Sequence, residues 1–230
     1  MLFSIVNGKK TEASPNMRGI CPLCNNEVLS KCGEINVWHW AHINDQNCDD
    51  WHEPETAWHK NWKLVFGKEN CEVVISKNNK RHIADIETNE GVIIELQNSP
   101  IKYQVIETRE EFYGERMIWI INGSHFNKNF ILPFARLMED NDYYNTHYPP
   151  AKNEKSINYY RKDLIDFTWK RPRKSWEAAR RDVFIDLGKE KLFQIKEGIG
   201  QSNGTGSYYD KKEFIIKHGG NIDLLPSVIY

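Results

Sequence analysis

The chain has 230 residues, a formal net charge of −1, 40% hydrophobic residues and eight tryptophans. This composition predicts a packed globular protein and excludes intrinsic disorder, because so many aromatic side chains need a core. The near-neutral charge excludes a uniformly basic nucleic-acid-binding protein, so a phosphate-rich partner would have to meet a local basic segment. There is no apolar run of membrane-spanning length and no secretory signal, so we expect a cytoplasmic protein.

The first motif in the chain is a cluster of cysteines and histidines. Cys21 and Cys24 form a Cys-x2-Cys pair, and fourteen residues separate it from a His-x2-His pair, His39 and His42. Two close pairs of thiolate and imidazole groups are the ligands that tetrahedral zinc requires. The intervening residues alternate as in a hairpin, which would return the chain to the metal. The sequence therefore predicts a structural Zn²⁺ site.

Two other interpretations of the cluster stay open. A thioredoxin-like redox pair would begin a helix after a strand, which residues 25–28 do not resemble. The cysteines could also be buried structural residues beside unrelated histidines. Zinc is favoured because cysteines in a chain without an export signal are more typical of metal binding than of disulfides. Cys32 or Cys48 could replace one histidine, and a closed four-ligand site would stabilise the fold and not catalyse.

Residues 53–66 predict a helix, because acidic residues and a proline lie in its first turn and Gly67 follows its end. Glu55, His59 and Lys63 recur at every fourth position and share one helix face. One interpretation of this stripe is a solvated surface with weak ion pairs. The functional alternative is that Glu55 supports a metal ion or its water, while His59 and Lys63 face phosphate.

Three strands, a second helix and a fourth strand are expected next. They are predicted at residues 71–76, 81–88 and 92–97, then 101–115 for the helix and 117–121 for the last strand. With the first helix they form an α-β-β-β-α-β unit, which indicates a small α/β sandwich.

Asp85 and Glu95 lie on the two strands of a hairpin whose turn is at residues 89–91. Acidic residues in a hairpin can simply face solvent. Glu95, however, lies in an apolar run typical of a buried strand, and a buried carboxylate needs a metal, a cation or hydrogen bonds. Carboxylate oxygens are the ligands that Mg²⁺ prefers. The hairpin, with Gln97 two residues after Glu95, therefore predicts a Mg²⁺ or Mn²⁺ site like that of a metal-dependent nuclease.

The last third of the chain shows fewer motifs. Residues 139–160 are polar, contain two adjacent prolines and are expected to form a linker or exposed loop. Residues 161–181 carry eight basic and three acidic side chains, which indicates a phosphate-binding stripe or a solvated helix face. Trp169 and Trp176 could stack on single-stranded nucleic acid or lie in the core. Residues 196–212 are rich in glycine and serine and are expected to form a mobile loop.

The order of these motifs resembles the competence protein CoiA-like family, which belongs to the PD-(D/E)XK nuclease superfamily. The resemblance covers about residues 1–125, and its stretches are CPLC, WHWAH, Glu55-x3-His59-x3-Lys63, Asp85, Glu95-Leu96-Gln97 and Arg109-x3-Tyr113. It implies a zinc-ribbon-like module at residues 1–52 and a restriction-endonuclease-like core at residues 53–135. A small α+β extension with the basic segment would occupy residues 136–230.

The resemblance also implies a metal-dependent deoxyribonuclease. Asp85 and Glu95 would hold Mg²⁺ or Mn²⁺ together with the Leu96 carbonyl, with Glu55 supporting the metal shell. His59, Lys63 and Arg109 would bind DNA phosphates. From the residues alone, Arg109 could equally form a structural ion pair with Glu111 or Glu115.

Gln97 would position the attacking water, but it stands where most of the superfamily has lysine. A neutral amide can orient water without adding positive charge. An alternative is therefore a weak or inactive nuclease fold that serves as a zinc-stabilised DNA-binding or recombination accessory protein. A third possibility is a subunit that works only with a protein partner in DNA uptake or in defence against foreign DNA.

Overall fold

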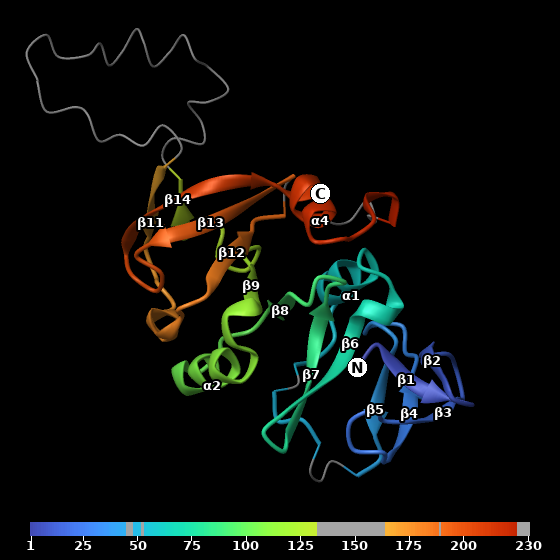
Figure 1. The fold of residues 1–230 in the computed structure, drawn as a ribbon. Helices are drawn as coiled ribbons and strands as arrows, with labels where there is room; N and C mark the ends of the chain where they lie inside the picture. Colours follow the sequence, from blue (N-terminus) through green and yellow to red (C-terminus); the bar gives the residue numbers. More distant parts are fainter. Residues whose placement is uncertain (45–47, 52, 133–163, 189, 225–230) are drawn as a thin grey trace, which may run out of the picture.

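The computed structural model describes residues 1–44, 48–51, 53–132, 164–188 and 190–224 (Figure 1). The expected linker at residues 139–160 lies outside these described residues. Within them the protein is mixed α/β, with one five-stranded and one nine-stranded sheet. No helix in the described part is long and apolar enough to cross a membrane.

The amino-terminal module is a small antiparallel sheet of strand order β2-β1-β3-β4-β5. Its core is small, and partly buried Val74 and Ile83 of the larger sheet pack against it. The module therefore lies beside β6 and β7, as Figure 1 shows. Its strands are β1 (Phe3–Val6), β2 (Lys9–Glu12), β3 (Arg18–Ile20), β4 (Glu27–Lys31) and β5 (His39–His42).

The predicted α-β-β-β-α-β order is confirmed. The first helix begins later than expected, because Thr56 is extended and its side chain accepts the His59 backbone N–H at 3.2 Å, which caps the helix. The elements are α1 (Ala57–Leu64), β6 (Cys71–Lys77), β7 (Lys80–Glu87), β8 (Ile93–Gln97), α2 (Tyr103–Tyr113) and β9 (Met117–Asn122).

The carboxy-terminal strands continue the same sheet. Strand β12 pairs in parallel with β9, and the full order is β10-β11-β14-β13-β12-β9-β8-β7-β6. Strands from both sides of the expected boundary near residue 135 therefore belong to one sheet. The added elements are β10 (Phe130–Ile131), β11 (Ile165–Trp169), β12 (Asp182–Asp186), β13 (Lys191–Glu197), β14 (Asn203–Asp210) and α4 (Lys211–Lys217).

Each face of the large sheet has its own hydrophobic core. Residues of α1 and α4 pack together on one face, where Trp62 and Phe214 meet edge to face at 6.2 Å. The other face is covered by α2 and by a 3-10 helix at Lys174–Ala178. Trp169 and Trp176 are fully buried in this second core. Their alternative role in stacking on single-stranded nucleic acid is therefore wrong.

The glycine-rich stretch expected to be a mobile loop is in part a strand, β14. A Cβ at Gly206 would lie 2.3 Å from the Gln194 carbonyl oxygen and 2.5 Å from the ring of Phe193. A Cβ at Gly204 would lie 2.7 Å from the ring of Phe167. The glycines are therefore present because aromatic rings pack directly against the strand backbone, and not because the segment lacks structure.

Replacing Gly206 with alanine should lower the free energy of unfolding by about 1–3 kcal/mol, because neither the carbonyl nor the ring can move freely. Gly33→Ala is the matched control, since nothing lies within 4 Å of a Cβ there. Denaturant unfolding of both variants measures the difference. Equal stability of the two would contradict this packing.

Candidate functional site: a cysteine–histidine cluster beside an acidic pair

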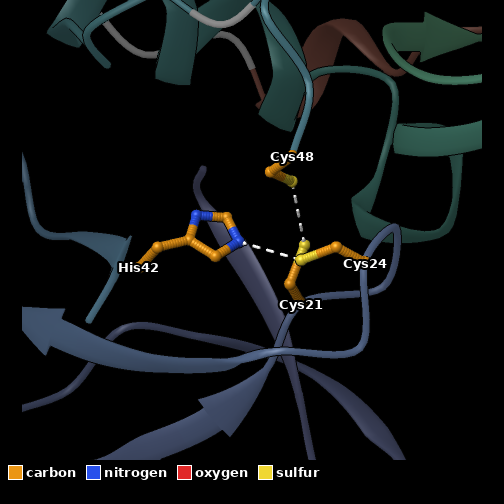
Figure 2. A group of neighbouring side chains, drawn as sticks. All are labelled: Cys21, Cys24, His42 and Cys48. Carbon is orange, nitrogen blue, oxygen red and sulfur yellow. Dashed lines mark hydrogen bonds between the residues drawn. The ribbon is translucent and has the colours of Figure 1, made fainter. Parts of the chain in front are cut away.

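Four side chains of the amino-terminal module converge as zinc ligands would. Ligand atoms of Cys21, Cys24, His42 and Cys48 all lie within 4.8 Å of one another (Figure 2). The Cys21 and Cys48 sulfurs are 3.7 Å apart, and Cys24 Sγ is 3.3 Å from His42 Nε2. Tetrahedral ligands about 2.3 Å from a zinc ion would be separated by about 3.8 Å. The donor set and its spacing therefore fit a structural zinc ion.

His39 is not part of this cluster, so the predicted fourth ligand is wrong. His39 and His42 are three residues apart on strand β5, and a strand turns residues at that spacing toward opposite faces. The His39 ring instead contacts the Val37 carbonyl oxygen at 2.8 Å. Cys48, which the sequence offered as a substitute, takes its place.

The predicted acidic pair lies where the ladder between β7 and β8 ends. The two strands pair only at Ile86↔Ile94 and Glu87↔Ile93. Beyond that point the Asp85 carboxylate accepts the Leu96 backbone N–H at 2.9 Å, in place of a strand partner. The Asp85 backbone N–H lies 3.4 Å from the Glu95 carboxylate. The structure thus brings Asp85 and Glu95 together beside the Leu96 carbonyl.

Glu95 is buried, and burial followed by the charge of Asp85 raises its pKa from 4.5 to about 8. At neutral pH without a metal, this carboxyl therefore holds a proton. Because the unfolded chain releases that proton near pH 4.5, the metal-free fold loses stability as pH rises from about 4.5 to about 8.

A cation bound by Glu95 must displace its proton. The affinity for Mn²⁺ should therefore rise by up to about tenfold per pH unit below pH 8 and level off above it. Titration calorimetry with the zinc-loaded protein between pH 6 and pH 9 measures this. A pH-independent affinity would mean that Glu95 does not hold the metal.

Lys63 lies at the centre of the carboxylate cluster. Its ammonium is 3.0 Å from Glu55, 3.0 Å from Glu72 and 3.2 Å from Asp85. Burial would lower the pKa of Lys63, but these three charges outweigh burial and raise the pKa well above its usual value. The sequence assigned Lys63 to phosphate, whereas all three ionic partners described here are carboxylates. Lys63 thus compensates part of the acidic charge.

Sequence reasoning missed Glu72. It is buried, and its carboxylate also accepts the backbone N–H groups of Leu2 and Phe3 at 2.6 and 2.8 Å. Its φ of 46° is in the left-handed region, which is unfavourable for a residue with a side chain. Glu72 thereby ties strand β1 to the acidic site. A glutamate near the start of a strand usually faces solvent, so no pattern in the sequence indicates this role.

Glu53 is a further carboxylate that was not singled out from the sequence. His59 and Gln97 lie on either side of it. His59 Nε2 lies 3.2 Å from the Leu96 carbonyl and 3.5 Å from Glu53. The Gln97 amide donates to Glu53, whose other oxygen accepts the Asn98 backbone N–H at 3.1 Å. Burial opposes ionisation of Glu53, but hydrogen bonds from His59, Ser99 and the Asn98 backbone outweigh it and lower its pKa to about 2. Glu53 is therefore an ionised anchor for the end of β8.

Arg109 of α2 points at the acidic pair. Its guanidinium donates to Glu95 at 2.9 Å and to the backbone carbonyl of Trp51. The expected alternatives, pairs with Glu111 or Glu115, do not appear among the ion pairs of the described residues. Burial, followed by the charge of Glu95, raises the pKa of neighbouring Tyr113. The second helix therefore supplies a cation to the metal-site candidate.

A cavity of about 580 Å³ connects the two sites. Its lining includes zinc-cluster residues His42 and Cys48 as well as Asp85, Glu95 and Arg109. The acidic pair therefore opens onto a space that the amino-terminal module helps to enclose.

Comparison with known proteins bears on the amino-terminal part of the chain. Residues 7–50 match the family model described as Competence protein CoiA, N-terminal domain. No curated protein and no solved structure matches the chain. The match spans all four residues of the cysteine–histidine cluster. The amino-terminal module is thus similar to the amino-terminal domain of competence protein CoiA.

Proposed function

We propose that the protein is a metal-dependent nuclease of the PD-(D/E)XK type that hydrolyses DNA phosphodiester bonds. The observation that carries this proposal is the pairing of Asp85 with buried Glu95 at the splayed end of a hairpin, open to a cavity. The half-buried Asp85 carboxylate, the buried Glu95 carboxylate and a backbone carbonyl form an oxygen ligand set that fits Mg²⁺ or Mn²⁺. A divalent cation there would activate water and stabilise the leaving oxyanion.

The charge balance of the site supports the same proposal. Glu55, Glu72, Asp85 and Glu95 surround the two buried cations Lys63 and Arg109. Ionised together, these four acids outnumber the two side-chain cations by two, and the amino-terminal ammonium near Glu72 offsets only part of this excess, so the site favours a further cation. Without such a cation, protonation of Glu95 removes one of the excess negative charges, as its raised pKa indicates.

The surrounding residues have distinct roles in this proposal. Lys63 holds Asp85 and Glu55 in place, and His59 fixes the Leu96 carbonyl by a hydrogen bond. Arg109 orients Glu95 and offers positive charge toward a phosphate. Gln97 donates from its amide nitrogen to Glu53 and to the Ser99 carbonyl, and its buried amide oxygen, which has no partner among the described residues, is left to accept a hydrogen bond from water.

A basic segment beside the site supports DNA as the substrate. Lys170, Arg171 and Lys174 are exposed, and Arg173 lies over the ring of Phe126 at 4.7 Å. Burial lowers the pKa of Arg173, and the charge of Glu53 opposes this shift, so the Arg173 guanidinium is within electrostatic range of Glu53. The match to the competence protein CoiA domain supports a role in DNA uptake.

One observation favours the accessory-protein alternative. Asp85 and Glu95 each already have a protein cation, Lys63 at 3.2 Å and Arg109 at 2.9 Å. Cations that replace the metal would leave a DNA-binding fold without activity.

Incubation of the zinc-loaded protein with single- and double-stranded DNA decides between the two functions. Cleavage with Mg²⁺ or Mn²⁺ that stops with a chelator of these ions supports the nuclease. DNA binding by fluorescence anisotropy with no cleavage under any metal would support the accessory protein.

A further inference from the structure

The chain that leaves the zinc cluster crosses directly to the acidic pair. Cys48 belongs to the cluster, and three of the described residues that follow it, Asp49, Trp51 and Glu53, each contact a different part of the acidic site. We call residues 48–51 and 53 the bridge segment. None of its contacts is needed to close the zinc cluster, so they call for a separate explanation.

Asp49 binds the part of β7 that β8 does not reach. One carboxylate oxygen accepts the Ile83 backbone N–H at 2.7 Å, and the other lies 3.0 Å from His82 Nδ1. Ile83 is two residues before Asp85, and the β7–β8 ladder begins only at Ile86. Asp49 thus takes the place of a missing strand partner next to Asp85.

Asp49, Asp50 and His82 also lie within 4.8 Å of one another, the spacing of a possible metal cluster. Both oxygens of Asp49 are already engaged, however, by a backbone N–H and by the histidine ring. The hydrogen bonds fix the strand and explain the cluster without a cation.

Trp51 fixes the cation that faces Glu95. Its ring stacks on His82 with centroids 3.4 Å apart and planes 6° from parallel. Its backbone carbonyl accepts a hydrogen bond from Arg109, whose other terminal nitrogen binds Glu95 at 2.9 Å. Among the described residues, the buried Nε of Arg109 has no partner. The position of the guanidinium therefore depends on Trp51 and Glu95.

Glu53 completes the bridge segment at the end of β8. Its carboxylate accepts the Asn98 backbone N–H at 3.1 Å and hydrogen bonds from Gln97 and Ser99. The bridge segment consequently contacts three parts of the structure around the acidic pair: strand β7, the Arg109 side chain and the end of β8.

We propose that the bridge segment makes the geometry of the Asp85–Glu95 pair depend on the zinc cluster, with Asp49 as the principal positioning residue. Zinc fixes Cys48, Cys48 fixes Asp49, and Asp49 fixes the strand that carries Asp85. The consequence for divalent-cation affinity rests on the proposed function, whereas the consequence for the strands does not.

Asp49→Ala tests this link, and Asp50→Ala is its matched control because Asp50 is the adjacent, exposed acid. His82→Ala removes the contact between Asp49 and His82 by changing strand β7, at a position distant in sequence from the residues of the zinc cluster. All three variants are compared with the wild type for zinc content, for amide hydrogen exchange at residues 81–86 and 95–98, and for Mn²⁺ affinity.

Asp49→Ala and His82→Ala should speed exchange in these two stretches and weaken Mn²⁺ binding about tenfold or more, with zinc retained. Asp50→Ala should resemble the wild type. Zinc removal from the wild type should expose the same amides while β9 and β12 stay protected. Wild-type exchange and Mn²⁺ affinity in both Asp49→Ala and His82→Ala would overturn the proposal. If the wild type binds no Mn²⁺, the nuclease proposal fails, and exchange alone decides the role of the segment.

Discussion

Asp85→Asn and Glu95→Gln should each reduce metal-dependent DNA cleavage by more than about 100-fold. Loss of a residue that merely supports a metal ligand costs about 10–100-fold, so loss of a ligand should cost more. Both changes keep the shape of the side chain. Asparagine can still accept the Leu96 N–H, and glutamine resembles the protonated form that the raised pKa of Glu95 favours near neutral pH. The fold should therefore survive while the metal site is lost.

Glu90→Gln is the control for this experiment, because Glu90 is exposed in the turn of the same hairpin and its replacement removes the same charge. Rates are measured with Mn²⁺ at equal zinc content, and melting temperatures are recorded for all variants. Residual activity near that of Glu90→Gln in either site variant would exclude the acidic pair as the catalytic centre.

Cys24→Ser should abolish stoichiometric zinc binding and unfold the amino-terminal sheet. The buried core of this module has few side chains, and one of them is the ligand Cys21. Such a small core does not stabilise a domain by itself, so we expect metal binding to supply its folding free energy, which is of order 10 kcal/mol in zinc-finger peptides. Hydrogen exchange should show loss of protection in β1 to β5, while β9 and β12 remain protected by the cores of the larger sheet.

Cys32→Ser is the matched control, because Cys32 is a partly buried cysteine of the same module that lies outside the cluster. It should keep one zinc ion per chain and a protected amino-terminal sheet. Full zinc content and wild-type protection in Cys24→Ser would show that the cluster is not a metal site.

Local patterns in the sequence were sufficient for the core elements. The strands at β6, β7 and β8 follow from apolar runs and a glycine turn, and the Asp85–Glu95 pairing follows from the hairpin. The extension of the sheet by β12 could not be predicted this way, because parallel pairing with β9 joins distant segments and depends on packing of the whole sheet. The glycines of β14 were interpreted as a loop, because the sequence does not show that they make room for aromatic rings.

Details of the site also escaped the sequence for physical reasons. The choice between His39 and Cys48 depends on strand parity in β5, which spacing alone does not reveal. Glu53 and Glu72 act through contacts with β8 and β1 that are remote in sequence. Lys63 looked like a phosphate ligand because its three carboxylate partners come from separate elements. The chemical type of a single site residue was predictable from the sequence, but the residues that contact it from other elements of the fold were not.

The most direct test of the account is anomalous diffraction at the manganese edge from crystals of the zinc-loaded protein soaked in Mn²⁺. The account predicts a peak about 2.1 Å from oxygens of Asp85 and Glu95 and from the Leu96 carbonyl, with Lys63 still among its carboxylates. Data at the zinc edge would separate this peak from the cysteine–histidine cluster. A well-ordered Asp85–Glu95 pair with no manganese peak, at a soak concentration that supports DNA cleavage, would contradict the account.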